Sequence, residues 1–104
     1  MLDPKIQKDI KDRLQEALRG RLQGILLYGS EARNESRADS DLDLLVLLEG
    51  PIRLGRDLEA IVDAIYPVQL ELDRPIHVTP VAAESFKAGQ YGIYREAQRE
   101  GILL

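Results

Sequence analysis

Two aspartates, Asp41 and Asp43, are the residues of this sequence best suited to chemistry. They stand one residue apart at the start of an apolar run, 42–48, which we predict to be a buried strand. Because side chains alternate across a strand, this spacing predicts that both carboxylates emerge on one face. Carboxylates beside apolar surface are costly to keep ionised unless something positive lies on them. Mg²⁺ is a suitable partner, since it takes oxygen ligands and is shared between carboxylates and substrate phosphates.

A Gly-Ser pair, Gly29 and Ser30, offers the complementary half of such a site. It ends the apolar run 24–29, which we predict to be a second buried strand, and Ser30 falls where that strand would turn into a short helix. A glycine lets a phosphate approach the backbone, and the start of a helix presents unpaired N–H groups to it. The sequence therefore indicates a metal site and a phosphate site within one unit.

Other interpretations of these residues are less consistent with the sequence. Asp39 could open a calcium loop with the two aspartates, but its sixth position would be Leu44 and its twelfth Gly50, where glycine and glutamate are needed. A Walker-type phosphate loop requires a lysine that does not follow Gly29 and Ser30. The remaining alternative is an ordinary turn followed by solvated aspartates.

The overall composition limits the classes of function. A chain of 104 residues is expected to form one domain, 1–104. Its net charge of −4 argues against a protein that grips long nucleic acids through a basic face. There is no cysteine, no apolar run long enough to span a membrane and no sign of a secretory signal, so we expect a cytoplasmic protein.

The elements that must position the site follow from hydrophobic spacing. Asp3 and Pro4 are typical of a helix start, and Pro75 and Pro80 limit any strand that contains them to a sheet edge or a bend. The predicted elements are a helix over 4–19, strands over 24–29 and 42–48, a helix over 56–66, strands over 67–73 and 75–81, and helices from 83 onward. This order predicts a small α/β (α+β) sandwich with helices packed on a mixed sheet.

Together these motifs resemble a known signature. The segment "LYGSEARNESRADSDLDLLV", with ten residues between Gly-Ser and Asp-Leu-Asp, resembles the DNA polymerase β-like nucleotidyltransferase superfamily. It is most similar to the minimal nucleotidyltransferases, small prokaryotic proteins often encoded beside a HEPN-domain partner. The ending "YREAQREGILL" is also similar, so the resemblance covers roughly residues 20–104.

The resemblance implies a role for each residue of the motif. Gly29 and Ser30 would bind a nucleoside triphosphate, and Asp41 and Asp43 would hold Mg²⁺. Arg33 would pair with phosphate oxygens, and a neighbouring loop arginine, Arg37, could do the same or be an ordinary solvated charge.

The family also usually carries a third carboxylate on a neighbouring strand, as metal ligand or base. The alternation of strand 67–73 places Glu71 and Asp73 on one polar face, and Glu71 is the expected third acid, with Asp73 behind it. A different alignment places His77 at this position.

The implied function is transfer of a nucleoside monophosphate, AMP from ATP, onto a hydroxyl. The resemblance implies that the acceptor is a tyrosine of a HEPN toxin partner, which would make this chain an antitoxin. Two alternatives stay open: a catalytically reduced module that inhibits its partner by occlusion, and one half of a small-molecule nucleotidyltransferase with its acceptor pocket at a homodimer interface. In either type of complex, apolar surface on helix 4–19 or on the tail 102–104 is a candidate contact.

Overall fold

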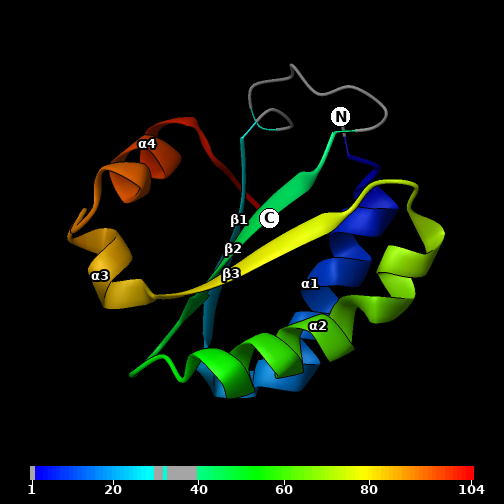
Figure 1. Cartoon of the computed structure of the whole chain (residues 1–104), viewed down its shortest axis with the longest axis horizontal. Helices are drawn as coiled ribbons and strands as arrows, with labels where there is room; N and C mark the ends of the chain where they lie inside the picture. The colour runs from blue at the N-terminus through cyan, green and yellow to red at the C-terminus, as the bar shows by residue number, and fades with distance from the viewer. Residues whose placement is uncertain (1, 30–31, 33–39) are drawn as a thin grey trace.

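The computed structural model describes residues 2–29, 32 and 40–104. The four strands within these residues form one mixed sheet in the order β3-β2-β1-β4 (Figure 1). The helices are α1 (Pro4–Leu18), η1 (Arg19–Arg21), α2 (Leu54–Glu71), α3 (Ala83–Lys87) and α4 (Gly92–Glu100). The strands are β1 (Leu22–Tyr28), β2 (Leu42–Leu48), β3 (Ile76–Ala82) and β4 (Ile102–Leu103). This is the single α+β domain with a mixed sheet that the sequence predicted.

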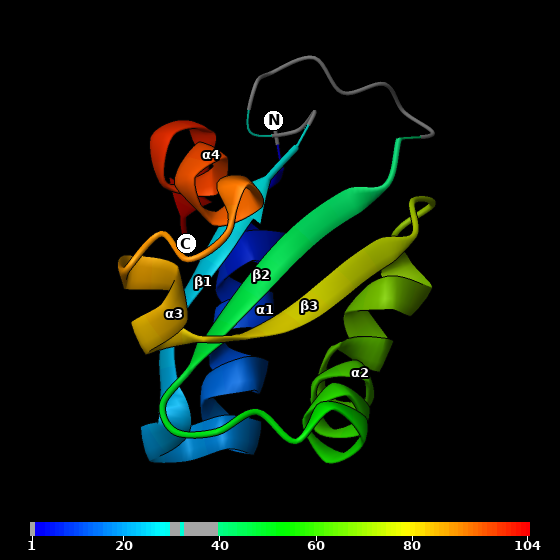
Figure 2. The ribbon, with the colours of Figure 1, turned by 60° about the vertical axis from the view of Figure 1, so that its left-hand side comes forward.

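The central strand β2 is antiparallel to β1 and parallel to β3, as Figure 2 shows with β2 between the other two. The parallel pairing requires a crossover, which α2 supplies. Because helices cover both faces of the sheet, β2 is apolar on both sides and its residues do not alternate in polarity. Asp43 is the polar residue within this strand.

The two faces of the sheet carry separate cores, and Figure 1 shows the sheet nearly edge-on with helices on either side. On one face, α1 and α2 pack against the larger core, to which β2 contributes Leu42, Leu44, Val46 and Leu48. On the other face, α3 and α4 pack against a smaller core that contains Leu45 and Leu47. Asp43 alternates with the first set, so it lies on the face of α3 and α4.

Most of the predicted elements are confirmed. Helix α1 begins where expected, with the Asp3 carboxylate accepting a hydrogen bond from the backbone N–H of Lys5 at 2.8 Å. Both central strands are present, and β3 is an edge strand, so Pro80 leaves no gap between strands. The apolar face of helix α1 packs into the core and is not an open contact surface, since Ile10 and Leu14 are fully buried.

The predicted strand over 67–73 is wrong, because α2 continues through Pro67 to Glu71. Its apolar residues follow the helical period, with Ile61, Ile65 and Val68 all buried in the core. Leu70, which an alternating strand would have turned inward, is 69% exposed. Tertiary packing of the helix face therefore outweighed a local alternation that was compatible with a strand.

The tail of the chain forms an edge. Strand β4 pairs antiparallel with β1, and the backbone N–H of Leu104 donates to the carbonyl of Ile25 at 2.9 Å. Ile102 is 40% exposed and Leu103 is 69% exposed, so the tail that the sequence marked as a candidate contact presents apolar surface. Among the described helices, none combines the length and apolarity that crossing a bilayer requires.

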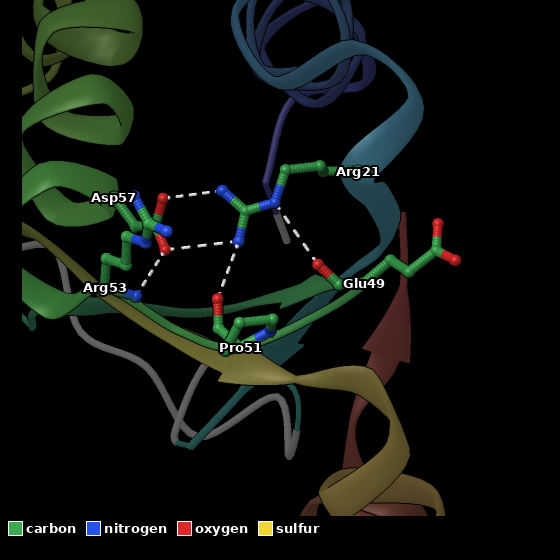
Figure 3. A network of polar contacts seen from close by, with 5 residues as sticks. All are labelled: Arg21, Glu49, Pro51, Arg53 and Asp57. Carbon is green, nitrogen blue, oxygen red and sulfur yellow. Dashed lines mark hydrogen bonds and ion pairs between the residues drawn. The ribbon is translucent and has the colours of Figure 1, made fainter.

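An ion pair between the half-exposed Arg21 and the buried carboxylate of Asp57 joins the far end of the sheet to α2 (Figure 3). Asp57 is 2% exposed, and its two carboxylate oxygens accept hydrogen bonds from Arg21 at 2.8 and 3.3 Å and from the Arg53 backbone N–H at 2.9 Å. Arg21 also donates to the carbonyls of Glu49 and Pro51, each at 3.2 Å. One guanidinium thus connects η1, the end of β2 and the first turn of α2.

We expect Arg21→Ala to destabilise the fold by about 2–3 kcal/mol, because it leaves the Asp57 carboxylate buried without its main partner. The hydrogen bond from Arg21 lowers the pKa of Asp57 below the ordinary range. The pair therefore contributes fully above the carboxyl range, and its contribution is lost as the pH falls through the folded-state pKa. Urea unfolding of both proteins should show a difference that is large at neutral pH and shrinks on acidification.

Arg13→Ala is the matched control, since Arg13 is as exposed as Arg21 but pairs, at 2.8 Å, with Asp9, whose carboxylate is not buried. Its loss should cost only about 0.5 kcal/mol. Equal losses in the two variants would contradict a structural role for the buried pair.

Candidate functional site

Asp43 lies between two other polar residues across the sheet. Its register partner on β1 is Tyr28, and its register partner on β3 is His77. Neighbouring strands stand about 4.8 Å apart, so side chains of paired residues on one face are adjacent. The position expected for a neighbouring-strand ligand of Asp43 is therefore held by His77.

Asp41 directly precedes β2 and contacts the same histidine. His77 Nε2 lies 2.9 Å from Asp41 Oδ2, and the two side chains are 60% and 50% exposed. The start of the strand is fixed by the backbone N–H of Leu42, which donates to the carbonyl of Pro75 at 2.8 Å. The two aspartates and His77 thus gather where β2 and β3 begin.

The electrostatics of Asp43 favour a cation beside it. Burial raises the pKa of Asp43; the interaction with His77 opposes this rise, and the charge of Asp41 adds to it. Burial also raises the pKa of Tyr28, and the Asp43 carboxylate contributes to that rise. A raised carboxyl pKa means that the ionised form is incompletely compensated by the protein.

Gly29 ends β1 in a conformation that favours glycine, with φ of +79°. A Cβ atom at this position would lie 2.7 Å from Asp43 Oδ2. Glycine is therefore required here for two reasons, the backbone conformation and the space occupied by the carboxylate. The carboxylate of Asp43 therefore lies beside Gly29, on the side where a side chain would project.

A shallow pocket of about 130 Å³ lies beside Gly29, between the end of β1 and α4. Tyr28 and Gly29 form one wall, and Ile93, Glu96, Ala97 and Glu100 form the other. Pockets for whole small-molecule ligands are about 300 Å³ or more, so this one can receive only part of a nucleotide.

The structure places Glu71 on a helix and not on a strand of the sheet. Glu71 is the exposed last residue of α2, the helix that covers the opposite face of the sheet from Asp43, so its predicted place on a strand beside Asp43 is wrong. Asp73 is exposed in the connection between α2 and β3. The residue in register with Asp43 on the neighbouring strand is His77. Assigning 67–71 to a helix would have identified it, because β3 is then the strand that pairs with β2.

Other predicted residues, Ser30, Arg33 and Arg37, lie outside the described residues. The sequence did not single out Tyr28. Its position directly before Gly29 could have indicated that it lies near the site. In the part of the chain that the structure describes, no three His, Asp or Glu side chains stand ready as a group that could hold a metal ion. The donors present, two carboxylates and an imidazole, nevertheless suit a divalent cation chemically.

Comparison with solved structures places this arrangement in a known fold. The chain is similar to spectinomycin adenyltransferase AAD(9) from Enterococcus faecialis, solved with ATP and spectinomycin, with a TM-score of 0.63 and 20% identity over 88% of this chain. The match covers 44% of AAD(9), so this chain spans less than half of that protein. It is also similar to a Sulfolobus solfataricus protein assigned to the nucleotidyltransferases, with a TM-score of 0.57, 17% identity and coverage of 95% of this chain and 76% of the other.

Sequence comparison leads to the same family. No curated protein matches the chain significantly. The family model of the nucleotidyltransferase domain, however, matches residues 5–104, which include both β1 with Gly29 and β2 with its aspartates. Since the match extends over nearly the whole sequence and the fold agrees with it, the chain belongs to the nucleotidyltransferase domain family.

Proposed function

We propose that this chain transfers AMP from ATP to a hydroxyl group in a reaction that depends on a divalent cation. The observation that carries the proposal is the placement of Asp41 and Asp43 at the start of β2, with Asp43 Oδ2 in the space that a side chain at position 29 would need. Membership of the nucleotidyltransferase domain family supports the reaction class. The similarity to AAD(9), which was solved with ATP, supports the choice of nucleotide.

The proposed reaction is a substitution at the α-phosphorus of ATP. The acceptor oxygen forms a bond to the α-phosphorus of ATP, the bond from that phosphorus to the bridging oxygen breaks, pyrophosphate leaves, and the hydroxyl proton passes to water. Asp41 and Asp43 would hold a divalent cation, Mg²⁺ in the simplest case, whose positive charge would offset the charge of the leaving pyrophosphate. Gly29 keeps the backbone accessible where the phosphates approach it.

The acceptor belongs to a separate partner in this proposal. Among the described residues, the pocket beside Gly29 holds only about 130 Å³. The resemblance to minimal nucleotidyltransferases motivates a HEPN-domain protein as the partner and one of its tyrosines as the acceptor. The chain would then act as an antitoxin.

The test is incubation of the chain with ATP, Mg²⁺ and the HEPN protein encoded beside it. We expect the partner to gain the mass of one or more AMP groups, each less one water, and the modification to fall on tyrosine. Intact-mass spectrometry followed by peptide mapping measures both. Tight association without a mass change would contradict transfer and favour inhibition by occlusion.

A small-molecule acceptor is the second candidate, favoured by the similarity to AAD(9), whose structure contains spectinomycin. Under this alternative the chain alone, as a homo-oligomer, would consume ATP and modify an aminocyclitol without a protein partner. Pyrophosphate release with spectinomycin as the sole acceptor separates the two candidates. Release in the absence of any partner protein would favour the small-molecule acceptor.

A further inference from the structure

A cavity of about 520 Å³ lies at the end of the sheet that is far from the aspartates. Arg21, Arg53 and Arg56 line it, together with Glu49 and the segment that follows β2. Asp43 lies near the start of β2 and Glu49 directly after its end, which at about 3.3 Å per residue places them about 20 Å apart. The cavity is therefore separate from the candidate functional site, and its volume is typical of small-molecule sites.

The charges around this cavity are mostly positive. Asp57 is the carboxylate beside the arginines: the hydrogen bond from Arg21 lowers its pKa most, and the charge of Arg53 lowers it further. One carboxylate thus serves two guanidinium groups. Among the described residues, no ion pair neutralises Arg56. The side chain of Glu49 is directed away from Arg53 and Asp57 (Figure 3), so the cavity keeps excess positive charge in a chain of net charge −4.

Arg21 is held in a fixed position beside this cavity. Its guanidinium group donates to both carboxylate oxygens of Asp57 and to the carbonyls of Glu49 and Pro51, yet its side chain is 41% exposed. A guanidinium group has five N–H donors, and these four contacts leave one for another anion. Because the side chain is already ordered, little conformational freedom would be lost when a ligand binds.

We propose that this cavity binds a phosphate-bearing small molecule, with Arg53 and Arg56 in contact with the phosphate groups and Arg21 as a fixed charge beside them. Guanidinium groups pair with phosphate oxygens through parallel N–H···O bonds, and a diphosphate or triphosphate carries several negative charges for the arginines to balance. A free polyphosphate and the polyphosphate of a nucleotide share this chemistry. A long nucleic acid is a poorer match, because it requires an extended basic face.

Isothermal titration calorimetry of the full chain with inorganic tripolyphosphate tests the proposal. The titration is run at low ionic strength in buffer freed of metal ions by a chelating resin, so it involves neither the proposed metal site nor the transfer reaction. We expect binding of one tripolyphosphate per chain. Arg53→Gln and Arg56→Gln should each weaken it about 10-fold or more, because each removes charge-assisted hydrogen bonds. Both side chains are exposed, so both variants should fold, which their melting temperatures check.

Arg99→Gln is the matched control, since Arg99 is an exposed arginine on α4, on the other face of the sheet. It should bind tripolyphosphate as the unmodified chain does. No binding by the unmodified chain, or equal losses in Arg99→Gln and the two cavity variants, would overturn the site.

Titrations with ATP, citrate and a single-stranded RNA distinguish the sources of the negative charge. ATP binding that the two cavity substitutions also weaken would assign the polyphosphate of a nucleotide as the ligand, whereas binding of tripolyphosphate alone would assign a free polyphosphate. Citrate binding as tight as that of tripolyphosphate would overturn the choice of phosphate. RNA binding tighter than that of tripolyphosphate would overturn the assignment to a small molecule.

Discussion

Asp43→Asn should reduce AMP transfer more than about 100-fold while leaving the melting temperature unchanged or higher. Even the outer-shell partners of metal ligands are worth about 10- to 100-fold, so loss of a direct ligand should exceed that range. The fold, by contrast, gains from the change, because burial raises the pKa of Asp43 and its ionised form is poorly compensated. Transfer rates measured with ATP and a thermal melt in the presence of a chelator test the two parts.

Asp63→Asn is the control for this experiment, since Asp63 is an exposed carboxylate on α2, the helix that covers the other face of the sheet. It should leave both the rate and the melting temperature unchanged. Transfer by Asp43→Asn at the rate of the unmodified chain would remove Asp43 from the proposed mechanism.

The second large effect is expected from Gly29→Ala. At φ of +79°, alanine costs about 1–2 kcal/mol in stability, and its Cβ would lie 2.7 Å from Asp43 Oδ2. The carboxylate is the movable partner, so it will be displaced by several tenths of an ångström or more. A misplacement of about 1 Å at a reacting centre can reduce the rate roughly 100-fold. We therefore expect a modest loss of stability and a much larger loss of transfer.

The chain contains a matched control for the backbone part of this effect. Gly50 has nearly the same conformation, with φ of +83°, but a Cβ there would meet nothing within 4 Å. Gly50→Ala should therefore lower the free energy of unfolding by a similar amount, about 1–2 kcal/mol, without affecting transfer. Unfolding free energies and transfer rates of the two variants isolate the contact with Asp43. Equal rates in the two variants would show that the space beside Asp43 is not needed.

Those parts of the fold with strong local signals could be predicted from the sequence. Asp3 and Pro4 mark the start of α1, and the continuous apolar run of β2 is typical of a strand buried on both faces. The segment 67–73 could not be read correctly, because Val68, Leu70 and Leu72 fit a strand period. Val68 and Leu72 also continue the helical spacing of Ile61 and Ile65 along the core. Only packing against the sheet decides between these periods.

For the candidate site, the sequence revealed the motif but left its third position open between Glu71, Asp73 and His77. The positions of Asp41, Asp43 and Gly29 follow from short spacings within two strands. His77 comes from a strand more than thirty residues later in the chain, and its place depends on the parallel register of β3 against β2. Register is a property of strand pairing, which no local pattern in 75–81 specifies.

Asp43 has a further consequence for how the chain folds to one structure. A strand that is apolar on both faces can slip by one residue and still bury leucines on each side, so its hydrophobic pattern barely distinguishes correct from slipped pairing. A slip of β2 would carry Asp43 into the layer of Leu42 and Leu44, which are fully buried under α1 and α2. An unpaired carboxylate there would cost several kcal/mol. Asp43, which is proposed to hold the ion, therefore also disfavours the slipped register and helps to specify the native pairing of β2.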